Sequence, residues 1–152
     1  MKDNFVFLKP CKLIDNDLEL VLSKKYLADR KKGYVPAYEF DMKNSQTGEK
    51  MGQIKLRVGY NEKIKYGGHV GYGVNEKFRG HHYAARSLKL IFPLAKKHRL
   101  NPLYVTCDPE NIPSRKTCER AGGTLEEIVN LPKYNDQYIA GKRNKCRYRF
   151  DL

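Results

Sequence analysis

The chain has 152 residues, a net charge of +13 and a hydrophobic fraction of 40%, with eleven tyrosines and six phenylalanines. This length predicts a single domain, residues 1–152, and the apolar content excludes a disordered chain dominated by charge. No apolar run approaches the roughly 20 residues that a membrane span needs, and the amino terminus lacks a basic segment followed by an apolar one, so we expect a cytoplasmic protein. The positive charge would attract anions, whether nucleic acid, an acidic acceptor or a phosphorylated cofactor.

The four cysteines are spread along the chain without a CxxC pair or a histidine at metal-ligand spacing. Two of them, Cys107 and Cys146, lie in apolar patterns typical of strands, where cysteine often serves as a small hydrophobic residue. We therefore predict no metal site and four reduced thiols, the other two being Cys11 and Cys118.

The amino-terminal third predicts a strand, a helix and a hairpin in that order. Phe5–Leu8 reads as a short strand, and Asp15–Asn16 as the cap of a helix that extends to Tyr26. Alternation of apolar and charged residues then predicts two hairpin strands, at residues 38–42 and 54–58, around a turn at 44–48.

The rest of the chain combines helical and strand patterns. The glycine-rich segment Gly67–Val74 continues the sheet, and its glycines indicate close approach of another backbone or a ligand. Further elements are predicted as a helix from Ala84 to Arg99, a strand over 103–107, a helix over 113–121, strands over 125–129 and 146–150, and an irregular loop over 130–145. The fold class is α/β (α+β), with a mixed and mostly antiparallel sheet flanked by helices.

A strand-to-helix junction at Val74–Ala84 is the first candidate site. The amino end of a helix presents unpaired N–H groups and a positive dipole that favour a pyrophosphate, and Arg79 adds charge. Spacing alone is a weak signal, and the alternative is an ordinary turn between a strand and a helix.

This junction resembles motif A of the GNAT acetyltransferases, Arg/Gln-x-x-Gly-x-Gly/Ala, which wraps the pyrophosphate of coenzyme A. Arg79 and Ala84 match the motif, whereas the central glycine of the family falls on His82. The departure places a side chain where backbone normally approaches phosphate. The resemblance implies that the cofactor-binding residues of this motif are Val74, Arg79, Gly80, His81, His82, Tyr83 and Ala84.

A second segment follows at the distance that the family shows. Asn111, Ser114, Cys118–Glu119 and Gly122 resemble motif B, Asn-x-x-Ser-x-x-x-Tyr-Glu-x-x-Gly. The resemblance implies that Asn111 holds the pantetheine arm, with Ser114 nearby. The alternative is that both residues only cap a helix.

Cys118 occupies the position at which the family has a tyrosine that protonates the departing thiolate. The resemblance therefore makes Cys118 a candidate general acid, because its ordinary pKa of about 8.5 is close to that of the leaving thiol. The alternatives are that Cys118 only packs in the core and that Tyr72, Tyr83 or water donates the proton.

His69 is the first candidate for the base that removes a proton from the amine. It lies five residues before the end of the glycine-rich strand, near where relatives place a Glu or His, and the ordinary histidine pKa suits the task. The alternative is that His69 holds the glycine-rich segment by hydrogen bonds. Glu62 and Glu76 are weaker candidates, since each is flanked by lysine.

Membership of this family would imply transfer of acetyl from acetyl-CoA to an amine by direct attack, in a cleft between two splayed strands. Three segments without diagnostic pattern, residues 23–36, 59–67 and 130–145, are expected to shape the acceptor pocket. The acceptor is open, from small amines to proteins, although the positive charge disfavours a polycation. A homodimer is compatible with the family. The rival functions are a basic nucleic-acid-binding module and a non-catalytic domain that binds coenzyme A.

Overall fold

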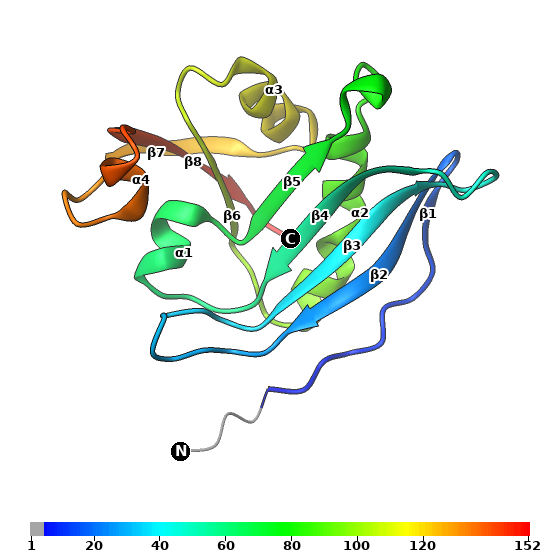
Figure 1. Ribbon diagram of the computed structural model, residues 1–152, viewed down its shortest axis with the longest axis horizontal. Coiled ribbons are helices and arrows are strands. Elements are labelled where there is room, and N and C mark those ends of the chain that lie inside the picture. Colours follow the sequence, from blue (N-terminus) through cyan, green and yellow to red (C-terminus); the bar gives the residue numbers. More distant parts are fainter. Residues whose placement is uncertain (1–4) are drawn as a thin grey trace.

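The computed structural model describes residues 5–152, which form two antiparallel sheets and four α-helices (Figure 1). The strands are β1 (Leu13–Asp15), β2 (Leu18–Tyr26), β3 (Ala37–Asn44), β4 (Lys50–Arg57), β5 (Val70–Val74), β6 (Leu103–Cys107), β7 (Thr124–Asn130) and β8 (Asn144–Phe150). The helices are α1 (Glu62–Gly67), the 3-10 helix η1 (Glu76–Phe78), α2 (Tyr83–Lys97), α3 (Ile112–Arg120) and α4 (Asp136–Ile139).

The larger sheet has the order β1-β2-β3-β4-β5, with every neighbouring pair antiparallel. The predicted hairpin is confirmed, since Phe40 pairs with Ile54 across β3 and β4. Alternation places Ile54 and Leu56 in the core under α2, which packs across this face, while Lys55 and Arg57 point to the other face. Figure 1 shows α2 behind the sheet and no helix in front of β2–β5.

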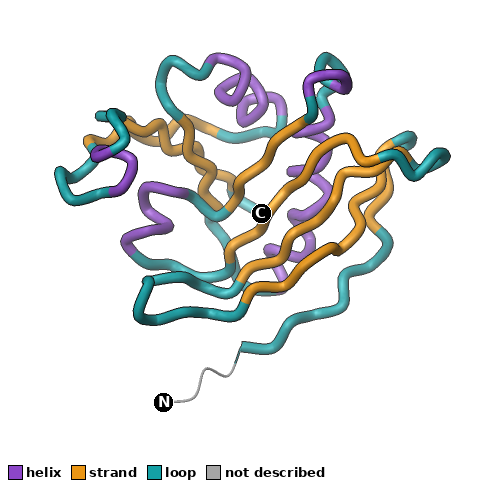
Figure 2. The backbone as a smooth tube through the Cα atoms, in the orientation of Figure 1, coloured by secondary structure: helices purple, strands orange, loops and turns teal. Residues whose placement is uncertain are grey.

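The smaller sheet has the order β6-β8-β7 and carries the carboxyl-terminal half of the core. The predicted strand over 103–107 is confirmed, and the helix predicted over 113–121 is α3, displaced by one residue. The loop predicted over 130–145 contains the short helix α4 and the ends of β7 and β8. The two sheets are seen as separate groups of strands in Figure 2.

The first two elements predicted from the sequence are wrong. Residues 15–26 do not form a helix but the end of β1, a turn and β2, in which Leu18 and Leu20 alternate into the core at 0% and 5% exposure. Pairing along β3 therefore decides between two apolar periods that the same segment contains. The segment Phe5–Leu8 is not a strand, because the Leu8 amide donates to the Tyr38 hydroxyl instead of to a neighbouring strand, at 2.7 Å.

Candidate active site

The two sheets meet at the starts of β5 and β6 and separate beyond that point. The His69 amide donates to the Tyr104 carbonyl at 2.8 Å, and the Tyr104 amide donates back to His69 Nδ1 at 2.9 Å. Because Nδ1 accepts, His69 Nε2 is the protonated nitrogen and donates to the Gly59 carbonyl at 3.0 Å. The His69 imidazole thus takes the place of a backbone acceptor at the vertex where β5 and β6 diverge.

His69 is fully buried, with both ring nitrogens engaged. Burial lowers the pKa of His69 to about 4, so the ring is neutral near pH 7. A base needs a free lone pair that reaches the amine, and the only lone pair of this tautomer already accepts from Tyr104. The geometry favours the alternative that His69 holds the glycine-rich segment by hydrogen bonds. A role of His69 as the base stays a prediction, and this arrangement does not support it.

The loop between β5 and α2 has the backbone of a phosphate-binding turn. Gly80 has φ 95°, and a side chain there would meet no atom within 4 Å. His82 occupies the left-handed region at φ 60° and ψ 26°, a conformation that glycine adopts readily and that histidine tolerates better than most residues. The departure at His82 therefore changes the side chain but keeps the backbone that glycine would adopt.

The amino end of α2 is open. No side chain caps it, so its first N–H groups are available to an anion. The predicted residues gather around this end: Arg79 donates from Nε to the Val74 carbonyl at 3.2 Å, and the exposed His81 ring lies 5.4 Å from that of Tyr83. These residues fit a pyrophosphate, because they combine free donors, positive charge and an unobstructed turn.

A network that sequence reasoning missed anchors this turn to the first hairpin. Arg86 of α2 donates from Nε to Asp15 and from Nη2 to Asp17, both at 2.7 Å. The Tyr83 hydroxyl donates to the second oxygen of Asp17 at 2.5 Å. The helix predicted over residues 15–26 gives no reason to place these carboxylates beside α2, and no local sequence pattern indicates the contact.

A second group of predicted residues lies between β5 and α3. The Tyr72 and Ser114 hydroxyls are 2.8 Å apart, and Cys118 contacts both Tyr72 and Cys107. Hydrogen bonding to Cys107 and burial raise the pKa of the fully buried Cys118 thiol. Burial also raises the pKa of Tyr72, so this hydroxyl keeps its proton. Of the donors considered from the sequence, Tyr72 is the one whose hydroxyl contacts motif B, through Ser114.

Asn111 caps α3, as the alternative interpretation of motif B expected. Its side-chain oxygen accepts from the Ser114 amide at 3.2 Å. The cap fixes the start of α3 and thereby holds the Ser114 hydroxyl against Tyr72 of β5. This use of the oxygen does not engage the side-chain NH₂ of Asn111, which is exposed.

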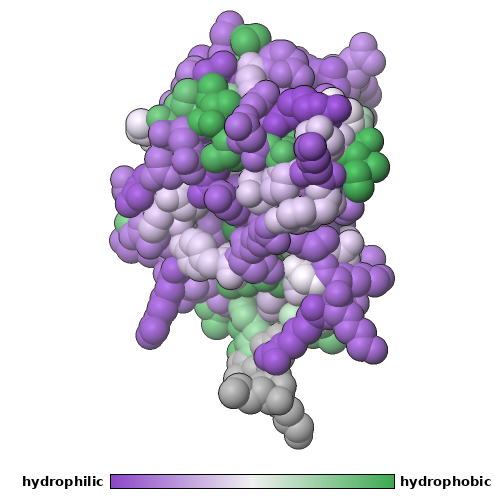
Figure 3. Space-filling view, turned by 90° about the vertical axis from the view of Figure 1, so that its left-hand side faces the viewer, coloured by the Kyte–Doolittle hydropathy of each residue, from purple (hydrophilic) through white to green (hydrophobic). Residues whose placement is uncertain are grey.

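One cavity of about 770 Å³ is bordered by all three segments that were expected to shape the acceptor pocket. Its lining residues include Tyr34, Ile64 and Tyr134 from these segments, together with Lys55 and Arg57 of β4, which sequence reasoning did not single out. Figure 3 views the side on which α1 and α4 lie, and it shows mostly hydrophilic residues with the hydrophobic ones in separate groups.

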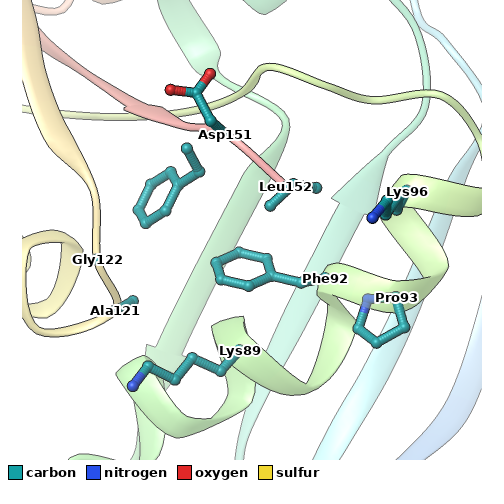
Figure 4. Close-up of a pocket in the computed structure, with 9 residues that line it drawn as sticks. Lys89, Phe92, Pro93, Lys96, Ala121, Gly122, Asp151 and Leu152 are labelled. Atoms are coloured by element: carbon teal, nitrogen blue, oxygen red, sulfur yellow. The ribbon is translucent and has the colours of Figure 1, made fainter.

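A smaller cavity of about 410 Å³ lies between α2 and the last residues of the chain. Figure 4 shows Lys89, Phe92, Pro93 and Lys96 on one side of it and Asp151 and Leu152 on the other. It contains none of the predicted site residues.

The cysteines described by the structure are free thiols, with Cys11 exposed and the other three buried. Within residues 5–152, no group of three or more His, Cys, Asp or Glu side chains is arranged to hold a metal ion. No helix in that part of the chain is long and apolar enough to cross a membrane.

A sheet that divides between β5 and β6, with an open helix end following β5, defines the class of acyltransferase folds that the two motifs indicated. A family model described as an acetyltransferase (GNAT) domain matches residues 12–124. The chain belongs to the GNAT acetyltransferase family.

Solved GNAT structures share this fold. A GNAT-family acetyltransferase from Bacillus anthracis aligns with a TM-score of 0.59 and 19% identity over 74% of this chain and 65% of that protein. The microcin C7 self-immunity acetyltransferase MccE, in complex with acetyl-CoA and AMP, aligns at 0.59 and 18% over 76% and 61%. The ribosomal L7/L12 alpha-N-protein acetyltransferase RimL, in complex with coenzyme A, aligns at 0.65 and 15% over 91% and 96%.

The chain spans less than two thirds of the length of the first two proteins, and at these identities the likeness shows the fold. No curated protein sequence matches the chain significantly.

Proposed function

We propose that the chain is a single acetyltransferase domain that moves acetyl from acetyl-CoA to an amine by direct attack in a ternary complex. The observation that carries this proposal is the open amino end of α2, preceded by the left-handed turn at Gly80 and His82, beside the split between β5 and β6. Acetyl-CoA and coenzyme A in the MccE and RimL structures support the choice of acyl donor.

In this proposal two regions hold the acyl donor. The turn from Arg79 to His82 and the first N–H groups of α2 bind the pyrophosphate. The pantetheine arm enters between β5 and α3, where the exposed side-chain NH₂ of Asn111 is available to it. The cavity lined by β4, α1 and the segment around α4 receives the amine, and we place the meeting point of the two reactants at β5, which pairs with β4.

The chemical step forms a bond between the amine nitrogen and the acetyl carbon and breaks the bond from that carbon to sulfur. Backbone N–H groups of β5 polarise the carbonyl, the proton of the amine leaves to water in the cavity, and the thiolate takes a proton from the donor beside it. We assign that donor to the Tyr72 hydroxyl, which is 2.8 Å from the Ser114 hydroxyl of motif B, and leave Cys118 in the core, where it is fully buried.

Thermal unfolding with acetyl-CoA tests the proposal. At a concentration 100 times the dissociation constant, a single site stabilises the fold by about 2.7 kcal/mol, which raises the midpoint by about 5–10 °C for a chain of this size. We expect a saturable shift with acetyl-CoA and coenzyme A but not with ATP, followed by thiol release in a screen of amines.

The same measurement at two salt concentrations separates this function from nucleic-acid binding. A duplex or single-stranded oligonucleotide that binds through charge loses affinity steeply as salt rises. Stabilisation by oligonucleotide alone, with no response to either thioester or free coenzyme A, would overturn the proposal.

A further inference from the structure

Cations outnumber anions around the cavity that we assign to the acceptor. Lys55, Arg57 and Lys63 line it, against Glu62 and Asp136. Glu62 already accepts a hydrogen bond from the Tyr134 hydroxyl. Both lysines lie over tyrosine rings, with Lys55 Nζ at 3.9 Å from the centre of the Tyr26 ring and Lys63 Nζ at 5.1 Å from that of Tyr34.

Arg57 is the cation in this cavity that lacks both a carboxylate and an aromatic partner among residues 5–152. Its Nη1 donates to the carbonyls of Gly68 and Gly67, at 3.2 and 3.5 Å, whereas Nε and Nη2 have no protein acceptor in that part of the chain. Burial lowers the pKa of this guanidinium, which nevertheless stays charged.

A guanidinium that is partly removed from water without a counter-ion is costly, and an anionic ligand offsets that cost. Its flat fork of N–H donors matches the two oxygens of a carboxylate. Lys55 adds to the same field, and its own pKa is lowered by burial and by the charge of Arg57.

The position of Arg57 relates this charge to the reaction. Arg57 lies at the end of β4, and its amide donates to the His69 carbonyl at 2.7 Å. Its Nη2 lies over the next strand, where a side chain added at Gly71 would come within 3.2 Å of it. The guanidinium therefore sits between the cavity and β5, the strand along which the acetyl group is proposed to lie.

We propose that the acceptor is a small amine that also carries a carboxylate, and that Arg57 binds this carboxylate and so directs the amine to β5. The inference rests on the proposed acetyltransferase function and specifies its substrate. A cavity of about 770 Å³ has the size of a small-molecule site. The absence of a side chain at Gly71 leaves room for the guanidinium and its ligand beside the strand.

The test compares amines in matched pairs that differ only in this carboxylate. Thiol release at saturating acetyl-CoA is measured for a panel of amino acids and the corresponding carboxamides. In parallel, thermal unfolding in the presence of coenzyme A is measured with the N-acetylated products of each pair. We expect the carboxylate member to be favoured about 10- to 100-fold in kcat/KM, and its product to stabilise the protein more.

Arg57→Met is expected to remove the preference, because KM rises much more for the carboxylate member of a pair than for its carboxamide. Arg57→Lys keeps the charge without the fork and is expected to restore only part of the preference. Lys43→Met, on β3 and outside the cavity lining, is the matched control for loss of one charge and is expected to keep the preference. Stabilisation by acetyl-CoA shows that each variant is folded.

The outcomes separate this inference from the proposed function. If acetyl-CoA stabilises the protein but no carboxylate is preferred in either assay, or if Arg57→Met keeps the preference, the inference is overturned and the acetyltransferase proposal stands. Acetylation of peptide amino termini without regard to any carboxylate overturns it as well. If acetyl-CoA does not bind but carboxylates stabilise in a manner that depends on Arg57, the anion site stands and the proposed function fails.

Discussion

At the scale of single residues, the structure distinguishes Cys118 from Tyr72 as the candidate proton donor, which the sequence could not do. Cys118 has the position of the family's proton donor, but it is fully buried against Cys107. Tyr72 comes from the opposite strand, and its hydroxyl is 2.8 Å from Ser114 in motif B. This contact supports our proposal that Tyr72, on the strand that faces α3, donates the proton in place of Cys118.

Tyr72→Phe removes this hydroxyl and keeps the ring that packs in the core. We expect kcat to fall by about 100-fold or more, with an amine found by the thiol-release screen, because a positioned proton donor contributes on this scale. Stabilisation by acetyl-CoA is expected to be unchanged. Cys118→Ser is the comparison, since it alters the buried thiol but leaves Tyr72 in place. Full activity in Tyr72→Phe together with loss in Cys118→Ser would instead make Cys118 the donor.

At the scale of elements, the turn that we propose to bind phosphate is connected to a hairpin distant in the sequence. Arg86 joins α2 to Asp15 at the end of β1 and to Asp17 in the turn before β2, and Tyr83 strengthens the connection. The helix end is thereby held against the edge of the larger sheet. A bridging guanidinium with two carboxylates is more rigid than a single surface ion pair.

Arg86→Met is expected to lower the free energy of unfolding by about 1–3 kcal/mol, because two partly buried carboxylates lose their charged donor. Stabilisation by acetyl-CoA should also decrease, since the turn that we propose to bind the pyrophosphate loses its anchor. Lys89→Met on the same helix forms no ion pair in the described structure and serves as the control. Equal loss in both variants would show that helix charge, rather than the connection, is responsible. Denaturant titration with and without acetyl-CoA gives both quantities.

For the whole molecule, the two sheets are joined at one buried histidine. His69 accepts from Tyr104 of β6 and donates to Gly59 in the loop after β4, so its neutral form belongs to the folded state. Its pKa is about 4 when folded and about 6.5 in an unfolded chain. Between these values the unfolded state binds more protons, and the stability therefore falls as the pH falls from about 6.5 to 4.

The loss attributed to His69 is about 3 kcal/mol over that interval. We expect His69→Asn, which keeps an acceptor for the Tyr104 amide, and His69→Gln, which keeps a donor for the Gly59 carbonyl, to be less stable near pH 7 but flatter between pH 4 and 6.5. His98, whose pKa is also lowered by burial, contributes the same slope in all three proteins. If His69 instead acts as the base, both variants lose activity, and the free energy of unfolding depends on pH in both variants as it does in the wild-type protein.

The sequence by itself determined the hairpin at 38–58, the helix after the glycine-rich strand and the two motifs of the family, because each depends on local periodicity or on residues close together in the chain. The sequence also shows that His82 replaces the central glycine of motif A. The sequence does not give the backbone conformation of His82, because only the folded turn shows that this histidine adopts the left-handed conformation.

Tertiary structure decided what depends on contacts between distant segments. Residues 18–26 carry both a helical and an alternating apolar period, and pairing with β3 selects the strand. Residues far apart in the sequence provide the partners of His69, the connection from Arg86 to Asp15 and the surroundings of Arg57. No local sequence pattern records these contacts. Charge, burial and hydrogen bonding of a side chain are properties of its surroundings, and only the fold brings those surroundings together.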